Sequence, residues 1–206
     1  MFVDMHLHEC TYSLDSKISL EDMVLEARQS GLDGICITDH DSMGLKNYAE
    51  RYAKEVDFPI FVGTEYLTLQ GDILAFGIDS LPVANLSAQH FIDYVTHQNG
   101  ICFAAHPFRN NKRGLEEHLG KVTGLTGIEV LNGNSTIAEN RKALEWCKEL
   151  NLHPVGGSDA HHVVQVGRYA TWLPTHAKSL KEFIALFKNH TPKPAVLKGY
   201  EIIEII

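Results

Sequence analysis

Five short apolar runs of this sequence each end in histidine or carboxylate side chains, the residue types that bind metal ions. In the first run, His6 and His8 alternate with aliphatic residues, so a strand would point both imidazoles at one face. The runs and their final residues are 2–7 with His6 and His8, 34–38 with Asp39 and His40, 60–64 with Glu65, 101–105 with His106, and 154–158 with Asp159 and His161. A single His-x-His is common on half-exposed strands, whereas five such coincidences in order indicate one shared site.

Apolar residues at helical spacing lie between most of these runs. The predicted helices follow Ser19 and end at Gly31, then span 44–54, 87–98, 137–150 and 180–188, with one short helix at most in the polar stretch 110–120. Two strands over 60–69 and 73–78 follow one another without a helix, and a terminal strand is expected over 202–206.

This alternation of strands and helices predicts an α/β protein with a mainly parallel sheet, either closed into a barrel or open and doubly wound. An open sheet gathers its ligands at one switch point, whereas here chemical groups follow almost every strand. We therefore favour a barrel, with seven strands as the best count, and expect residues 1–206 to form a single domain.

The composition is that of a globular chain, with 44% hydrophobic and 21% charged residues. Its four cysteines include no C-x-x-C pair, so neither a disulfide framework nor a cysteine zinc knuckle is indicated. No stretch is typical of a membrane span or a signal peptide, so we expect a cytoplasmic location and no membrane partner. The net charge of −8 argues against binding of extended nucleic acid.

Together the motifs resemble the polymerase and histidinol phosphatase (PHP) family, and the resemblance covers nearly the whole chain. The motifs are Asp4-Met5-His6-Leu7-His8, Thr38-Asp39-His40, Gly63-Thr64-Glu65, Ala105-His106-Pro107 and Gly157-Ser158-Asp159-Ala160-His161. The resemblance implies a distorted (β/α)7, TIM-like barrel. It also implies two or three divalent metals, such as zinc, manganese or iron, that hydrolyse phosphoester bonds.

The resemblance also implies a ligand for each metal. His6, His8, Glu65 and Asp159 would hold the first metal, Glu65 would bridge to a second metal completed by His106, and Asp15, His40 and His161 would hold a third. One position departs from the family pattern, because Asp72 stands where compact members often carry a histidine. An aspartate also ligates hard divalent ions, so Asp72 is retained as a ligand of the second metal.

Four carboxylates in one place, on Asp15, Glu65, Asp72 and Asp159, would repel one another without cations, which independently favours metal. A hydroxide shared by the metals on Glu65 would attack the phosphorus, and the third metal would bind the phosphate. The predicted catalytic residues are Glu65, His161, Arg109 and Arg168, of which the two arginines would clamp the phosphate.

Other polar residues near the strand ends leave alternatives open. Asp4 and Asp39 either fix an imidazole tautomer or cap strand ends. Glu129 and Asn132 either face the pocket or satisfy loop backbone, whereas Arg113 is expected to be a solvated loop charge.

The preferred function is hydrolysis of a small phosphomonoester, a nucleotide or a phosphorylated metabolite. The alternatives are a phosphodiesterase or exonuclease on short oligonucleotides, and a non-catalytic metal-binding regulatory domain. An amidohydrolase commonly needs a lysine at a late strand end, and no predicted strand ends in lysine.

Overall fold

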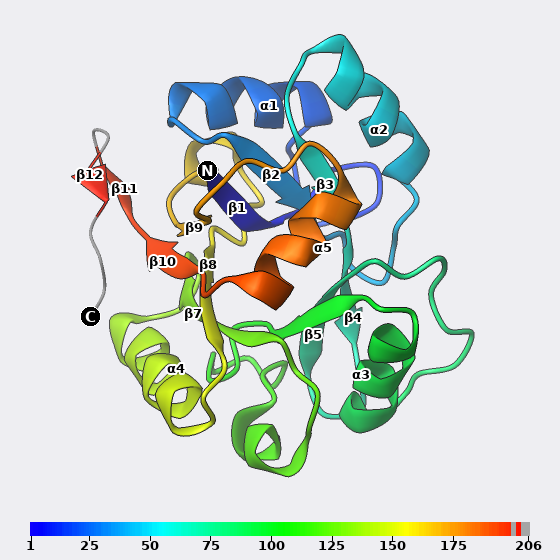
Figure 1. Ribbon diagram of the computed structural model, residues 1–206, viewed down its shortest axis with the longest axis vertical. Coiled ribbons are helices and arrows are strands. Elements are labelled where there is room, and N and C mark those ends of the chain that lie inside the picture. Colours follow the sequence, from blue (N-terminus) through cyan, green and yellow to red (C-terminus); the bar gives the residue numbers. More distant parts are fainter. Residues whose placement is uncertain (199–200, 203–206) are drawn as a thin grey trace.

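The computed structural model describes residues 1–198 and 201–202, in which most strands belong to two five-stranded sheets (Figure 1). The first sheet has the order β10 (Lys193–Ala195), β9 (Ala170–Trp172), β1 (Phe2–Leu7), β2 (Gly34–Ile37) and β3 (Ile60–Val62). The second has the order β4 (Thr64–Leu67), β5 (Asp72–Phe76), β6 (Ile101–Ala104), β7 (Gly127–Asn132) and β8 (His153–Gly157). A small hairpin pairs β11 (Leu197–Lys198) with β12 (Glu201–Ile202). Most of the terminal strand expected over 202–206 lies outside the described residues.

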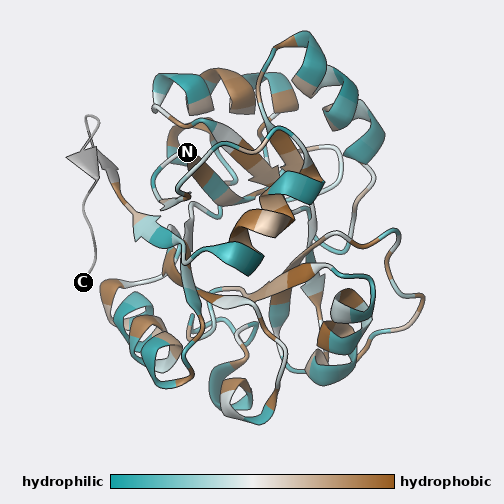
Figure 2. Cartoon of the chain, viewed as in Figure 1, coloured by the Kyte–Doolittle hydropathy of each residue, from teal (hydrophilic) through white to brown (hydrophobic). Residues whose placement is uncertain are grey.

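Helices cover the outer face of each sheet. Helices α1 (Leu20–Gln29) and α2 (Lys46–Glu55) pack on β1, β2 and β3, while α3 (Ala88–His97) and α4 (Ile137–Glu149) pack on β5, β6 and β7. Their apolar faces turn toward the strands and their hydrophilic faces outward (Figure 2). None of the helices in this described part is both long enough and apolar enough to cross a membrane.

The boundaries of the five α-helices described agree with the sequence predictions to within about two residues, and side-chain caps fix where each begins except α2. Ser19, Ser87 and Ser179 each accept a hydrogen bond from a backbone N–H of the first turn. Thr136 forms a capping box with Glu139 at the start of α4. The stretch 110–120 contains the start of one short 3₁₀ helix (Glu116–Lys121).

Helix α5 (Leu180–Asn189) fills the space between the inner faces of the two sheets, where it crosses in front of the strands in Figure 1. The ring of Phe183 stacks on Phe61 of the first sheet, with centroids 4.3 Å apart, and meets Phe76 of the second sheet edge-on at 5.7 Å. Phe187 contacts Phe103 edge-on at 5.0 Å. The buried aromatic side chains of α5 therefore join the two sheets through contacts with β3, β5 and β6.

The closed seven-stranded barrel is not confirmed, because the described strands divide into two sheets, and their pairing is mixed rather than mainly parallel. The pairs β1–β2, β2–β3, β6–β7 and β7–β8 are parallel, whereas β4–β5, β5–β6 and β1–β9 are antiparallel. The expected strand over 60–69 is divided at Gly63, where a Cβ would lie 2.4 Å from the carbonyl oxygen of Ala75. Glycine thus permits the chain to bend there from the first sheet into the second.

Candidate metal centre

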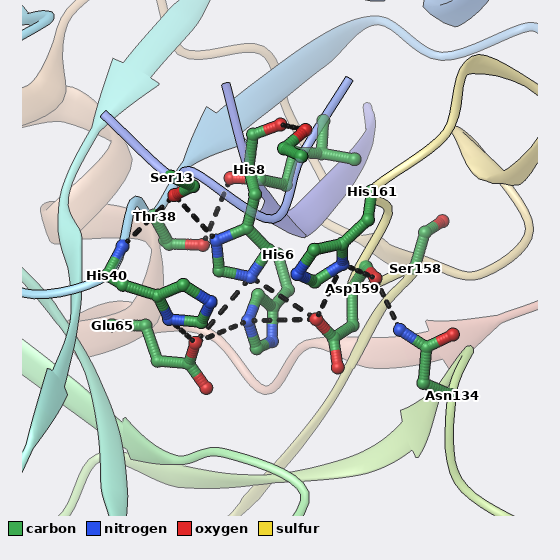
Figure 3. Close-up of polar contacts among 12 residues, drawn as sticks. His6, His8, Ser13, Thr38, His40, Glu65, Asn134, Ser158, Asp159 and His161 are labelled. Atoms are coloured by element: carbon green, nitrogen blue, oxygen red, sulfur yellow. Dashed lines mark hydrogen bonds and ion pairs between the residues drawn. The ribbon is translucent and has the colours of Figure 1, made fainter. Parts of the chain in front are cut away.

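The carboxyl ends of strands from both sheets meet at two seams. At one seam the Asp159 N–H donates to the carbonyl of His6 at 2.8 Å, and at the other the Glu65 N–H donates to the carbonyl of Asp39 at 3.1 Å. The side chains at these seams point toward one another, as Figure 3 shows. These backbone hydrogen bonds between the two sheets therefore bring together residues that are far apart in the sequence.

Four buried side chains form the centre of the cluster. His8 Nε2 lies 3.2 Å from Asp159 Oδ1 and 3.5 Å from Glu65 Oε2. His6 Nε2 lies 3.6 Å from each of the same two oxygens. Two imidazole nitrogens and two carboxylate oxygens therefore face a common point, which is the donor set expected for the first metal.

The inward-facing atoms of this group lack hydrogen-bond partners. His6 Nε2, His8 Nε2 and Glu65 Oε2 are buried and make no hydrogen bond in the described part of the chain, although Glu65 Oε2 lies 2.7 Å from His40 Nδ1. Buried polar atoms are nearly always paired, because leaving them unpaired costs about 1–3 kcal/mol each. A divalent cation at this point would satisfy all three atoms, so the residues fit the metal that the sequence predicts.

Two further groups of ligand atoms adjoin the first one. His106 Nε2 lies 2.7 Å from Glu65 Oε1 and 3.8 Å from Asp72 Oδ2. On the other side, Asp15 Oδ2 lies 3.2 Å from His40 Nε2 and 3.3 Å from His161 Nε2. The structure thus brings together all nine side chains predicted as metal ligands: His6, His8, Asp15, His40, Glu65, Asp72, His106, Asp159 and His161.

The electrostatics of the centre keep its carboxylates charged. Burial opposes ionisation of Glu65 and Asp159, but the nearby imidazoles, led by His6, outweigh it and hold both pKa values well below the usual range. Burial, aided by His6, outweighs the nearby carboxylates and lowers the pKa of His8 to about 4, which keeps this imidazole neutral and able to donate a lone pair. Buried charged carboxylates beside a neutral imidazole are suited to a cation.

Glu129 at β7 and Ser13 orient the ligand imidazoles. Glu129 Oε1 lies 3.1 Å from His6 Nδ1, and its Oε2 accepts the backbone N–H of His106 at 2.8 Å. Ser13 Oγ lies 3.3 Å from His8 Nδ1 and donates to Asp39 Oδ1 at 2.7 Å. Because the outer ring nitrogens are engaged, the inner nitrogens face the cluster.

The sequence left open whether Asp4 and Asp39 set imidazole tautomers, and the structure shows that they hold backbone instead. Asp4 accepts the N–H groups of Ser158 at 2.8 Å and Gly167 at 3.0 Å, and Asp39 accepts the N–H of Glu9 at 2.7 Å. Asp39 reaches His8 through the hydroxyl of Ser13. Sequence reasoning missed Ser13, although its place between the first strand and Asp15 was a usable signal.

Asn132 faces the site. Its Nδ2 donates to Glu129 Oε2 at 3.0 Å and to Asp159 Oδ2 at 3.2 Å. Of the two readings that the sequence left open for Glu129 and Asn132, the structure therefore supports the one in which both face the pocket.

Three arginines lie around the cluster. Arg109 pairs with Asp159, and its Nη2 lies 3.2 Å from His106 Nε2. Arg168, predicted as a second clamp, instead donates to the carbonyl of Gly133 at 2.9 Å. The expectation that Arg113 is a solvated loop charge is wrong, because its guanidinium binds the buried carboxylate of Asp72.

Two of the ligand residues have left-handed backbone conformations. His106 has a φ of 29° and Asp159 a φ of 52°, and the nearby Asp41 has a φ of 45°. Such conformations are uncommon for residues other than glycine, and they occur often where a side chain must be aimed at a functional site. The backbone at these strand ends is thus shaped to direct His106 and Asp159 into the cluster.

A mixed α/β fold in which buried histidines and carboxylates converge at one end of two sheets is typical of metal-dependent hydrolases. Residues 4–151 match the PHP domain family, and residues 138–192 match its PHP-associated region. The chain belongs to the PHP domain family, as the resemblance of its motifs predicts.

Comparison with individual proteins agrees with this family. The uncharacterized protein MJ0417 of Methanocaldococcus jannaschii is 27% identical over 93% of this chain and 81% of its own. A Bifidobacterium adolescentis structure, whose name proposes a metal-dependent phosphoesterase, aligns with a TM-score of 0.67 at 20% identity, over 77% of this chain and 87% of its own. The lesion-specific endonuclease PfuEndoQ of Pyrococcus furiosus aligns with a TM-score of 0.62 at 16% identity, over 96% of this chain and 60% of its own. At these identities the two structures show a shared fold.

Proposed function

We propose that this protein hydrolyses small phosphomonoesters, such as nucleotides or phosphorylated metabolites, with divalent zinc, manganese or iron. The observation that carries the proposal is the convergence of buried, unpartnered ligand atoms on His6, His8 and Glu65. The family membership and the phosphoesterase-named structural neighbour agree with it.

The chain's own residues have separate roles in this proposal. His6, His8, Glu65 and Asp159 would hold one ion, and Asp15, His40 and His161 another. A bound divalent ion supplies a hydroxide nucleophile near neutral pH and positive charge for the phosphoryl oxygens. Glu129 and Ser13 keep the ligand nitrogens of His6 and His8 facing inward.

Arg109 is the residue best placed to bind the substrate phosphate. Its guanidinium lies at the cluster beside Asp159 and His106, and its Nε is buried without a hydrogen-bond partner in the described part of the chain. An unpaired N–H at this place is available to a phosphoryl oxygen. Arg168 would act less directly, through the backbone of Gly133, which follows Asn132.

A phosphate-release assay tests the proposal. Protein stripped with a chelator is incubated with nucleoside monophosphates and sugar phosphates, with manganese, zinc or iron added singly. We expect release of phosphate that depends on metal and is lost in Asp159→Asn. The absence of release with every metal and substrate, from protein that binds metal, would contradict the proposal.

Cleavage of phosphodiesters in short oligonucleotides is the second candidate. The same ligand set serves both reactions, and one protein that shares this fold is named as an endonuclease. Comparing bis(p-nitrophenyl) phosphate with p-nitrophenyl phosphate separates the two candidates, since a monoesterase favours the second substrate.

A further inference from the structure

Arg113 binds the one ligand position at which this chain departs from the family pattern. Asp72, at the start of β5, is fully buried and belongs to the group of possible ligands formed with Glu65 and His106. Arg113 Nε donates to Asp72 Oδ2 at 2.6 Å, and its Nη2 donates to Oδ1 at 3.0 Å. Both oxygens of this carboxylate are therefore engaged by one guanidinium in a bidentate pair.

The backbone fixes Arg113 in this position. The Asp72 N–H donates to the carbonyl of Arg113 at 2.7 Å, so the two residues are joined through main chain as well as side chain. Next to them, a Cβ on Gly71 would lie 2.6 Å from the carbonyl carbon of Gly114. This close backbone packing holds the main chain of Arg113 beside Asp72.

A second guanidinium faces the remaining histidine of the same group, since Arg109 Nη2 lies 3.2 Å from His106 Nε2. Two of the three group members are thus in contact with arginine. By contrast, the inward atoms of His6, His8 and Glu65 have no hydrogen-bond partner in the described part of the chain. Arg109 also pairs with Asp159 of the first set, but Asp159 Oδ1 still faces His8 Nε2 at 3.2 Å, whereas Arg113 engages both oxygens of Asp72.

We propose that Arg113 replaces a divalent ion at Glu65, Asp72 and His106, so that the centre binds two ions per chain rather than three. This inference rests on the proposed metal-dependent function and specifies its metal content. The guanidinium neutralises Asp72 and would repel a divalent ion placed against the same carboxylate. The two ions would then occupy the His6, His8, Glu65 and Asp159 set and the Asp15, His40 and His161 set.

Counting bound ions tests the proposal. Protein stripped of metal is dialysed to equilibrium against micromolar Mn²⁺, and manganese per chain is measured by elemental analysis. We expect two ions in the wild type and three in Arg113→Gln, which removes the charge beside Asp72. Arg113→Lys keeps the charge and is expected to hold two. Lys112→Gln removes an exposed charge from the same loop without touching Asp72 and is expected to hold two as well.

The outcomes are distinguishable from those of the activity assay. Three ions in the wild type or in Arg113→Lys would overturn the inference, as would two ions in Arg113→Gln. If Arg113→Gln fails to fold, as judged by circular dichroism, the counts for the wild type and Arg113→Lys decide. Phosphate release by a protein with three ions would leave the proposed function intact and reject only the inference, whereas failure to bind manganese, zinc or iron would reject both.

Discussion

The carboxylate of Glu129 lies 3.1 Å from Nδ1 of His6 and thereby turns Nε2 of the same ring toward Glu65 and Asp159. Strand β7 supplies the carboxylate and β1 supplies the histidine, so the contact joins the two sheets. Orientation of a ligand imidazole through its outer nitrogen is a general device of metal sites.

Replacing Glu129 by Gln is expected to weaken metal binding by about 10- to 100-fold. The amide presents no charge to His6 and is a poorer acceptor for its Nδ1–H. Titration of stripped protein with Mn²⁺ measures the dissociation constant. Glu145→Gln, on the exposed side of α4, is the matched control and should leave the constant unchanged. Equal constants for both variants would contradict a role of Glu129 in orienting His6.

Ser13→Ala is expected to lower the free energy of unfolding by about 1–3 kcal/mol, because Asp39 loses a buried hydroxyl donor. The same change removes the partner of His8 Nδ1 and so should also weaken metal binding. Urea unfolding of stripped protein measures the first effect and metal titration the second. Ser42→Ala serves as the control, since the Ser42 hydroxyl bonds only the exposed backbone of Gly44 among the contacts of the described residues.

Removal of metal is expected to lower the melting temperature. Without cations the buried carboxylates of Glu65 and Asp159 repel one another, and an ion at 100 times its dissociation constant adds about 2.7 kcal/mol of stability. Thermal unfolding at increasing Mn²⁺ concentration measures the shift. The shift should shrink in His8→Ala, and an equal shift in that variant would argue that the ion binds elsewhere.

Arg109→Ala is expected to raise KM for a phosphomonoester by roughly 10- to 100-fold, the cost of losing one charged hydrogen-bond donor to phosphate. Inhibition by inorganic phosphate should weaken in parallel. Steady-state kinetics with Lys112→Gln as the control measure both effects. A change confined to kcat would indicate that Arg109 acts on the reaction without binding the ground-state substrate.

Phe183→Ala is expected to destabilise the fold by about 3–5 kcal/mol, since the ring is fully buried between the sheets. Chemical unfolding measures this loss. Phe183→Leu, which retains most of the apolar volume, should cost less. A loss in Phe183→Leu as large as that in Phe183→Ala would instead show that stacking of the ring on Phe61, rather than buried apolar volume, accounts for the stability.

Local patterns made the helices and most strands predictable. Ser19, Ser87, Thr136 and Ser179 cap helices where the sequence places them, because a cap depends on residues only a few positions apart. The alternation in β1 also placed His6 and His8 on one side, and their ring centroids lie 4.9 Å apart.

Long-range relationships could not be obtained in this way. The division into two sheets depends on how closely Gly63 approaches Ala75, which no local pattern encodes. Arg113 and Asp72 are separated by 41 positions, and only their meeting in three dimensions turns a loop charge into a buried partner. Residue type and strand position thus identified the ligand candidates, whereas the residues that orient or neutralise them emerged from the structure.

The pairing of β1 with β9 determines how late in synthesis the first strand can be fully paired. Phe2 lies opposite Trp172, so the strand that bears His6 and His8 gains its second neighbour only after some 170 further residues have been made. Translation must therefore deliver almost the whole described chain before both flanks of that strand are covered, and a nascent chain halted before β9 would leave Phe2 and Val3 on an unprotected edge.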